Sequence, residues 1–321
     1  MRVSVELAPR SPTWEIGVLA GLAERLGFDA VWLSEHFFNR SSVVTAAYLL
    51  SRLRRAEVGL GVLNPYAYHP ALIAQVAATL TEVGPERVML GIGAGDATTL
   101  EALGVRRENP VERVRACVRS VRALLGGEGL AGGVRLDFRP ASEVRIYVAA
   151  QGPKMLELAG EEGDGALINP TNLPFIEESA RLVRSSAERA GRTVAVEVGL
   201  MVSVCEDRAK ALRAVKPYVA VVLAGSPAEY AARLGVDEGL LDRVRDLVRA
   251  GRWQEVREEL PDDVASSVAL AGTAEDVSRA IEGLPLKEID GLVIGGPLGP
   301  DPRRAIVELH RELTGRPLGG R

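Results

Sequence analysis

Short apolar runs alternate with longer stretches of helical period along the whole chain. Apolar runs bounded by glycine, proline or acidic residues are typical of buried strands, whereas apolar residues at every third or fourth position indicate amphipathic helices. The predicted strands are residues 2–8, 30–35, 57–63, 88–93, 145–150, 165–169, 194–204 and 291–295. Helical patterns between them include residues 14–26, 70–83, 111–125, 153–163 and 175–190.

Eight strand–helix units in this order predict an α/β fold, a TIM-like (β/α)8 barrel of parallel strands. A doubly wound sheet is the alternative architecture. The segment 207–285 is too long for a simple crossover and is mostly helical in period, so it predicts a helical insertion between strands seven and eight, beside the barrel mouth. We expect one barrel domain over residues 1–321.

Composition narrows the class of protein. The 321 residues are 47% hydrophobic with a formal net charge of -4, and basic residues alternate with acidic ones on helical stretches. These features favour a globular protein and give no electrostatic case for binding nucleic acid or a membrane surface. No apolar run is long enough to span a bilayer, and the first residues resemble a strand rather than a signal peptide, so we expect a cytoplasmic protein.

Cysteine and histidine are too sparse for a disulfide framework or a metal site. Cys117 and Cys205 lie far apart, and His36, His69 and His310 are isolated from one another. The chain has neither an H-E-x-x-H zinc motif nor a G-x-S-x-G nucleophile elbow. We therefore expect neither metal catalysis nor a serine nucleophile.

Polar residues follow several predicted strands, at the ends where a barrel carries its chemistry. A single acid or asparagine at such a position more often caps a helix, but several together favour a catalytic site. The candidates in chain order are Glu6, Glu35, His36, Asn64, Asp96, Gln151, Gly152 and Asn169.

Glycines interrupt the third and fourth predicted strands. Gly59 and Gly61 lie within the third, which is either a loosely built strand or one whose backbone must lie against a ligand. Residues 91–95, GIGAG, follow a spacing unlike that of dinucleotide-binding loops. We interpret these glycines, ending in Gly95, as a thin barrel wall against which a flat ring lies, with Asp96 at the rim.

The turn after the fifth predicted strand is a candidate anion site. Gly152 and Pro153 begin a helix, whose free N–H groups and dipole favour a phosphate. An ordinary strand-to-helix turn explains the same residues equally well.

Four blocks, GLGVLNPYAYHP, MLGIGAGDATTLEALG, VAAQGPKMLELAGEEGDGALIN and GGPLGPD, together resemble the bacterial luciferase-like superfamily. Within it the chain is most similar to the coenzyme F420-dependent methylenetetrahydromethanopterin reductases. The resemblance runs from the first strand to the last helix and implies a TIM-like barrel with inserted segments. It also implies a homodimer or higher homo-oligomer that transfers a hydride between the deazaflavin C5 of F420 and a small organic substrate, most directly 5,10-methylenetetrahydromethanopterin or a related pterin.

The resemblance assigns roles to individual residues. It implies a non-prolyl cis peptide at Gly61–Val62 against the deazaflavin ring, Glu6 near the reacting carbon, Asp96 in proton transfer, and a histidine shared with relatives at His36. Residues 149–152 match the segment around the coenzyme phosphate. The resulting candidate cofactor contacts are Glu35, Gly61, Val62, Asn64, Gly95, Ala149, Ala150, Gln151, Gly152 and Asn169.

One segment departs from the family pattern. The reductases have aspartate before the shared histidine and two asparagines shortly after it, whereas this chain reads SEHFFNR over residues 34–40. The departure bears on the substrate more than on the cofactor. Two alternative functions stay open: an FMN-dependent luciferase-like monooxygenase that uses oxygen, and a non-catalytic flavin-binding protein. A mere binder could lose Glu6, His36 and Asp96, which this chain retains.

Overall fold

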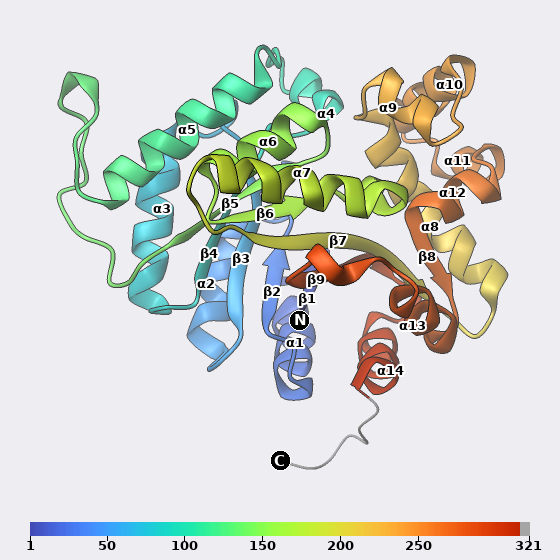
Figure 1. Cartoon of the computed structure of the whole chain (residues 1–321). Coiled ribbons are helices and arrows are strands. Elements are labelled where there is room, and N and C mark those ends of the chain that lie inside the picture. The colour runs from blue at the N-terminus through green and yellow to red at the C-terminus, as the bar shows by residue number, and fades with distance from the viewer. Residues whose placement is uncertain (315–321) are drawn as a thin grey trace. The chain divides into compact units, whose positions relative to one another are not determined.

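The strands occur where the sequence predicts them. The computed structural model describes residues 1–314, apart from the side chains of Thr98, Thr171, Asn172 and Thr314; residues 315–321 of the predicted domain lie outside the described residues. Eight strands correspond to the eight predicted ones, and β8 is an additional strand within the predicted helical insertion (Figure 1). The strands are β1 Arg2–Leu7, β2 Ala30–Leu33, β3 Glu57–Leu63, β4 Val88–Ile92, β5 Arg145–Ala150, β6 Gly165–Ile168, β7 Ala195–Val204, β8 Ala269–Gly272 and β9 Gly291–Leu298.

Eight of these strands close into a parallel barrel, which confirms the predicted fold. The order is β6-β5-β4-β3-β2-β1-β9-β7, and the pairing of Gly165–Ile168 with Ala195–Val198 joins β6 to β7 and completes the ring. β8 pairs with the second half of β7. A closed ring excludes the doubly wound alternative, whose sheet is open.

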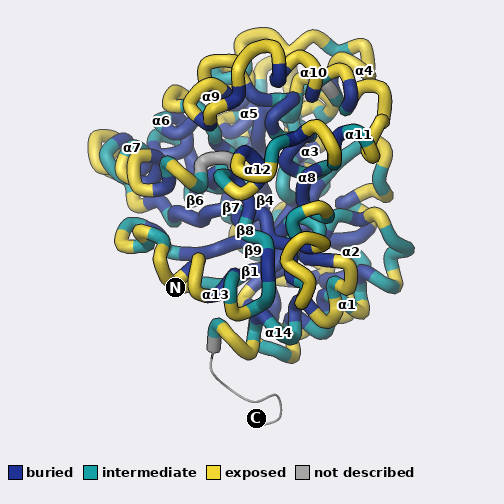
Figure 2. Tube along the Cα trace, turned by 90° about the vertical axis from the view of Figure 1, so that its right-hand side faces the viewer, coloured by how far each residue is buried: buried dark blue, intermediate teal, exposed yellow. Residues whose placement is uncertain are grey.

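Helices connect the strands, as a barrel of parallel strands requires. Figure 2 shows the contrast between buried strands and helices that expose their outer faces. The helices are α1 Thr13–Leu26, α2 Ser42–Arg52, α3 Pro70–Val83, α4 Ala97–Ala102, α5 Pro110–Leu125, α6 Pro153–Glu162, α7 Ile176–Arg189, α8 Arg208–Ala224, α9 Ala228–Arg233, α10 Glu238–Arg249, α11 Trp253–Glu259, α12 Asp262–Val268, α13 Ala274–Glu282 and α14 Pro302–Thr314.

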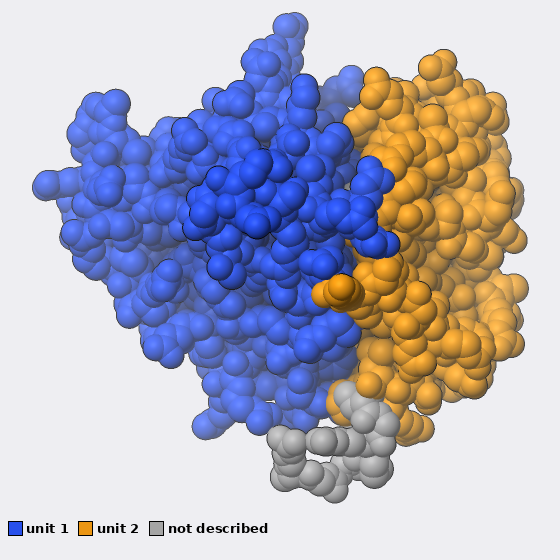
Figure 3. Space-filling view, in the orientation of Figure 1, with its two compact units in different colours: residues 1–168, 177–198, 288–293 blue, residues 169–176, 199–287, 294–321 orange. Residues whose placement is uncertain are grey.

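The chain divides into two compact units (Figure 3). Unit 1 comprises residues 1–168, 177–198 and 288–293, and it contains β1–β6 with the first parts of β7 and β9. Unit 2 comprises residues 169–176, 199–287 and 294–321. Its described core is helical, with the buried residues of α8, α10, α11 and α12 packed together beside β8.

Two large rings fill the barrel of unit 1. Trp32 and Tyr147, both fully buried, meet edge to face with ring centroids 5.2 Å apart. Each ring occupies space that a glycine leaves open: a Cβ at Gly59 would lie 2.2 Å from the Trp32 indole, and one at Gly165 would lie 2.2 Å from the Tyr147 ring. Register pairs Trp32 with Gly59 and Tyr147 with Gly165, so each ring lies over its neighbouring strand. The glycines are therefore explained by close packing of the interior.

A partly buried ion cluster lies in the same barrel, toward the amino ends of its strands. Glu197 on β7 is fully buried; it accepts a hydrogen bond from the Tyr147 hydroxyl at 3.2 Å and pairs with the Arg2 guanidinium at 3.3 Å. Glu57 pairs with both Arg2 and Arg145. Burial raises the pKa of the Glu197 carboxyl, and Arg2 and Tyr147 partly offset that rise. The cluster links β1, β3, β5 and β7, alternate strands of the ring, as layered barrel interiors do.

The fit of Trp32 over Gly59 predicts a large cost for one added methyl group. We expect Gly59→Ala to lower the free energy of unfolding by about 1–3 kcal/mol, because the added Cβ overpacks the core. Gly21→Ala is the matched control: a Cβ there meets its nearest neighbour at 3.5 Å, within α1, and should be neutral or stabilising. Chemical denaturation measures both changes. A cost for Gly59→Ala that is equally large in a Trp32→Leu background would contradict this explanation.

Candidate functional site

The predicted site residues gather at the carboxyl ends of the unit 1 strands, with one exception. Glu6 is on β1, Glu35 and His36 follow β2, Gly95 and Asp96 follow β4, and Gln151 and Gly152 follow β5. Gly61 and Val62 lie in β3, with Asn64 directly after it, and Ala149 and Ala150 end β5. Asn169 directly follows β6 but belongs to unit 2.

The third strand contains the predicted cis peptide. The bond between Gly61 and Val62 is cis and non-prolyl. The register of β3 against β4 shifts between Leu60 and Leu63, which pair with Leu90 and Ile92, so β3 carries one extra residue there. The position of the bond is confirmed, whereas its contact with a deazaflavin stays a prediction.

Protein packing accounts for most of the glycines next to this bulge. A Cβ at Gly61 would lie 3.2 Å from the Trp32 ring, one at Gly91 would lie 2.5 Å from the Leu60 carbonyl oxygen, and one at Gly93 would lie 3.0 Å from Val62. A Cβ at Gly91 would force the Leu60 backbone to shift, whereas at Gly61 and Gly93 the neighbouring side chain would have to move by a few tenths of an ångström. Gly95 has a φ of +68°, which favours glycine by itself.

Glu6 lies on the face of β1 that points into the barrel. It pairs in register with Trp32, and its half-buried side chain forms a hydrogen bond with Ser34. Burial raises the pKa of the Glu6 carboxyl, and the Ser34 hydrogen bond partly offsets that rise. A carboxyl with a raised pKa holds its proton closer to neutral pH, as a general acid requires.

Glu35 ties together two loops at the mouth. Its carboxylate accepts a hydrogen bond from the Ser42 N–H at 2.7 Å and one from the Tyr68 hydroxyl at 2.9 Å. Burial and the Glu35 carboxylate together raise the pKa of Tyr68 to about 12, so the hydroxyl stays a donor at neutral pH. Glu35 therefore joins the start of α2 to the loop between β3 and α3.

His36 and Asp96 interact electrostatically at the same end of the barrel. Burial lowers the pKa of His36; the nearby charges of Asp96 and Glu35 oppose that change, and Arg10 reinforces it. His36 is therefore mainly neutral at physiological pH. Asp96 also caps α4, because its Oδ1 accepts the Thr99 N–H at 2.7 Å.

Asn64 shapes the turn that follows the bulge. Its side-chain oxygen accepts the N–H groups of Tyr66 at 3.2 Å and Ala67 at 2.8 Å, an Asx-type turn. A Cβ at Gly95 would lie 3.3 Å from the Asn64 side chain, so the two loops pack closely. His69 caps α3, because its Nδ1 accepts the Ala71 N–H at 3.2 Å.

The turn at Gly152 leaves room beside a helix N-terminus. Gly152 is the N-cap of α6 with Pro153 at the first helical position, and no side chain caps the helix. A Cβ at Gly152 would meet nothing within 4 Å, and its φ of −86° suits any residue. The local packing therefore does not require glycine here, which is consistent with a ligand approaching the backbone.

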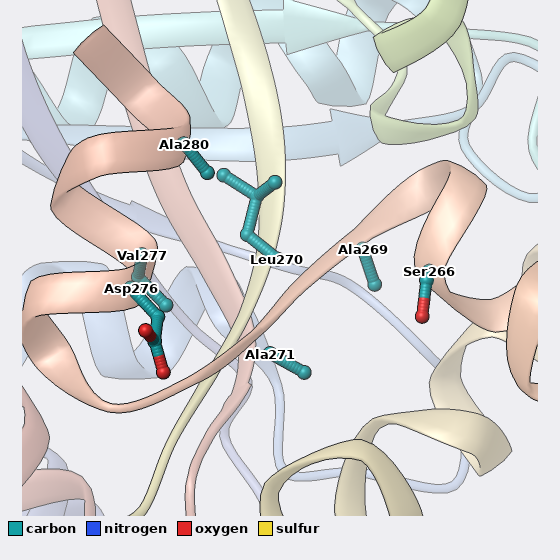
Figure 4. A pocket seen from close by; sticks show the side chains of 7 residues that line it. All are labelled: Ser266, Ala269, Leu270, Ala271, Asp276, Val277 and Ala280. Carbon is teal, nitrogen blue, oxygen red and sulfur yellow. The ribbon is translucent and has the colours of Figure 1, made fainter. Parts of the chain in front are cut away.

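Unit 2 contains a small pocket of about 210 Å³ (Figure 4). Asp276 is the one charged group in its lining, and the Arg208 guanidinium holds it at 2.6 and 3.0 Å and lowers its pKa. The same carboxylate completes the capping box of α13. The Asp276 hydrogen bonds therefore stabilise the start of α13 and the contact with Arg208. The lining residues are Ser266, Ala269, Leu270, Ala271, Asp276, Val277 and Ala280.

Residues 1–314 can be searched for metal-ligand groups and for membrane-spanning helices. No three His, Cys, Asp or Glu side chains described there are grouped so that they could hold a metal ion. None of the helices described there is long and apolar enough to cross a membrane.

A closed parallel barrel with a bulged third strand and acidic groups at its carboxyl ends is the architecture of luciferase-like enzymes, as the sequence resemblance implies. The model of the family described as luciferase-like monooxygenase matches residues 2–286. The chain belongs to this family.

Relatives of the chain include F420-dependent enzymes. A 5,10-methylenetetrahydromethanopterin reductase of Archaeoglobus fulgidus is 34% identical, with 98% of each chain covered. An F420-dependent glucose-6-phosphate dehydrogenase of Kineococcus radiotolerans is 29% identical, over 91% of this chain and 89% of the relative. Among solved structures, the coenzyme F420-dependent tetrahydromethanopterin reductase of Methanopyrus kandleri superposes with a TM-score of 0.84 at 26% identity, with 98% of each chain covered.

Two residues at the site were missed by the sequence reasoning. Ser34 has a detectable signal: it directly follows β2, and continued alternation of the strand places it on the same face as Trp32. Tyr68 has no detectable signal in the sequence, because its hydrogen-bond partner Glu35 lies 33 positions earlier in the chain.

The raised pKa of Glu6 predicts a pH-dependent gain in stability for Glu6→Gln. Above the ordinary value of 4.5 the unfolded chain loses this proton before the folded one, so folding stability conferred by Glu6 falls as pH rises. Glutamine does not titrate, so the variant should gain stability relative to the parent as pH rises above 4.5. Chemical denaturation over a pH series measures the difference.

Glu24→Gln is the control of opposite sign. Burial alone would raise the pKa of Glu24, but the N–H groups of Arg54, Arg55 and Ala56 outweigh it and the pKa is lowered. This variant should lose relative stability as pH rises. A pH trend of the same sign for both variants would contradict the assignment.

Proposed function

We propose that the protein is a coenzyme F420-dependent oxidoreductase that transfers a hydride to or from a small organic substrate. The similarity to F420-dependent enzymes over nearly the full chain supports the class. The observation that carries the proposal is the Glu6 carboxyl, held half-buried inside the barrel beside Trp32 with its pKa raised. A proton-holding group at this end of the barrel suits a reductase, whereas a passive flavin binder has no use for one.

The residues at the mouth suit a flat coenzyme with an anionic tail. Coenzyme F420, when bound, supplies a hydride at its ring carbon C5 as a two-electron unit. The backbone at Gly61 and Val62 and the side of Asn64 would support the ring. The open space at Gly152 and the uncapped start of α6 would receive a phosphate.

We propose a methylene-tetrahydropterin, most directly 5,10-methylenetetrahydromethanopterin, as the substrate. Relatives from Archaeoglobus fulgidus and Methanolobus tindarius carry this activity in their names, at 34% and 32% identity. Glu6 would hold the proton that goes to a bridging nitrogen of the substrate. The bond from that nitrogen to the methylene carbon then breaks, and the carbon accepts the hydride and becomes a methyl group.

The chain's own residues divide the remaining work. Ser34 fixes the Glu6 carboxyl through its hydrogen bond, and Trp32 and Tyr147 fill the interior of the same barrel. Neutral His36 and the cap residue Asp96 would orient the substrate at the rim. Asn169, which directly follows β6, stays a candidate coenzyme contact on the family resemblance.

The cofactor assignment is tested by comparing electron donors. We expect F420H2 to reduce 5,10-methylenetetrahydromethanopterin in the presence of the protein and FMNH2 not to do so, because the relatives are F420-dependent. The absorbance of the oxidised deazaflavin measures turnover. Product formation from FMNH2 and oxygen would instead support the monooxygenase alternative, and binding without turnover would support the non-catalytic one.

Two variants test whether Glu6 or Asp96 donates the proton. Glu6→Gln should lower kcat by roughly 10²–10⁴, the usual contribution of a general acid, with the Kd for F420 unchanged. Asp96→Asn is the matched change, because asparagine still caps α4 and its effect on kcat then reports chemistry alone. Single-turnover kinetics measures the hydride step. A Glu6→Gln rate equal to that of the parent, with a collapsed Asp96→Asn rate, would move the role to Asp96.

A further inference from the structure

The loop between β2 and α2 is tied down along its length. The Asn39 N–H donates to the His36 carbonyl at 2.9 Å, and the Arg40 N–H donates to the Pro9 carbonyl at 3.1 Å. The Arg40 guanidinium donates to the Arg10 carbonyl at 2.5 Å. The bonds of the Glu35 carboxylate to Ser42 and Tyr68 fix its start. The loop thus has a defined conformation at the mouth.

This fixed loop exposes two large apolar rings. The side chains of Phe37 and Phe38 are 54% and 58% exposed. Side chains on a well-anchored loop have few alternative positions in which to bury themselves. Adjacent exposed aromatic residues in a fixed loop are typical of surfaces that bind a ligand or partner.

The two rings form an aromatic corner that is continuous with the candidate site. The planes of Phe37 and Phe38 are 80° apart, with centroids at 5.3 Å. The His36 ring stacks on Phe38 at 5.1 Å and 14°. A flat ligand that lies parallel to one wall of such a corner meets the other wall edge-on, and both geometries are favourable for aromatic rings.

We propose that Phe37 and Phe38 are specificity-determining residues that stack against a planar nitrogen heterocycle of the substrate. The inference rests on the proposed function and assigns the substrate side of the same site. Continuity with His36, which lies near Asp96, favours a small molecule in the site over a second protein copy. The apolar rings also offer no hydrogen-bond donor to the hydroxyl groups of a sugar phosphate, whereas a fused heterocycle gains from stacking.

The test compares Phe37→Leu and Phe38→Leu with Phe38→Tyr, which keeps the ring. With F420H2 and 5,10-methylenetetrahydromethanopterin, each leucine variant should raise the KM for the pterin about tenfold, because an apolar side chain remains but the stacking is lost. The kcat and the KM for F420H2 should stay near the parent values. Phe38→Tyr should keep the parent KM.

Phe138→Leu is the matched control for loss of an exposed ring. Phe138 is 37% exposed on the connection that enters β5 at its amino end, opposite the candidate site. It should leave every kinetic constant unchanged. Thermal unfolding of all variants checks that each one folds.

The outcomes separate this inference from the proposed function. Parent turnover with unchanged KM in both leucine variants would overturn the inference alone. A changed molar mass of the leucine variants by light scattering, with the KM intact, would overturn it in favour of a contact between two copies. If the parent protein shows no turnover, calorimetry measures the binding of tetrahydromethanopterin instead. Weaker binding by the leucine variants than by the parent would support the inference independently of the proposed function. No binding by the parent, or equal binding by the parent and the variants, would overturn it.

Discussion

The packing of Trp32 and Tyr147 inside the barrel is the constraint on which the rest of the site depends. The two rings occupy the space left by Gly59 and Gly165 and meet edge to face at 5.2 Å. Glu6 on β1 is the register partner of Trp32, so its side chain lies on the same inner face of the barrel as these rings. Burial inside the barrel removes this carboxyl from water, which raises its pKa. The chemistry proposed for Glu6 is therefore a consequence of how the core is filled.

The loops at the mouth are held by the same polar side chains that the sequence marks as functional. Glu35 bonds to Ser42 and Tyr68, Asn64 closes a turn, and Asp96 caps α4. Each side chain satisfies backbone groups that would otherwise lack partners. Capping and catalysis are thus compatible uses of one residue, and the frequent structural use of an acid at a strand end does not argue against a functional one.

Much of the fold is predictable from the sequence, because strands covered on both faces are continuous apolar runs. β8 was not predicted, since its residues ALAG are short, small and embedded in a helical stretch. Glycine is needed at position 59 because of Trp32, which lies 27 positions earlier, so the residues next to Gly59 in the sequence do not indicate this need. The cis bond at Gly61–Val62 followed from family resemblance alone. Side-chain partners such as Tyr68 depend on loop geometry, which periodicity does not encode.

Some residues at the barrel mouth hold the loops and others are free to contact a ligand, and this difference affects how such a barrel can change its substrate during evolution. A mutation of Glu35, Asn64 or Asp96 alters a helix start or a turn together with any contact to a ligand, so selection on folding restricts those positions. Phe37 and Phe38 are exposed on a loop whose anchoring comes from backbone groups and from neighbouring side chains. Substitutions at Phe37 and Phe38 can therefore occur without changing the conformation of the loop. The residues that hold the loops of the barrel mouth are therefore distinct from Phe37 and Phe38, which can change and alter which substrate binds.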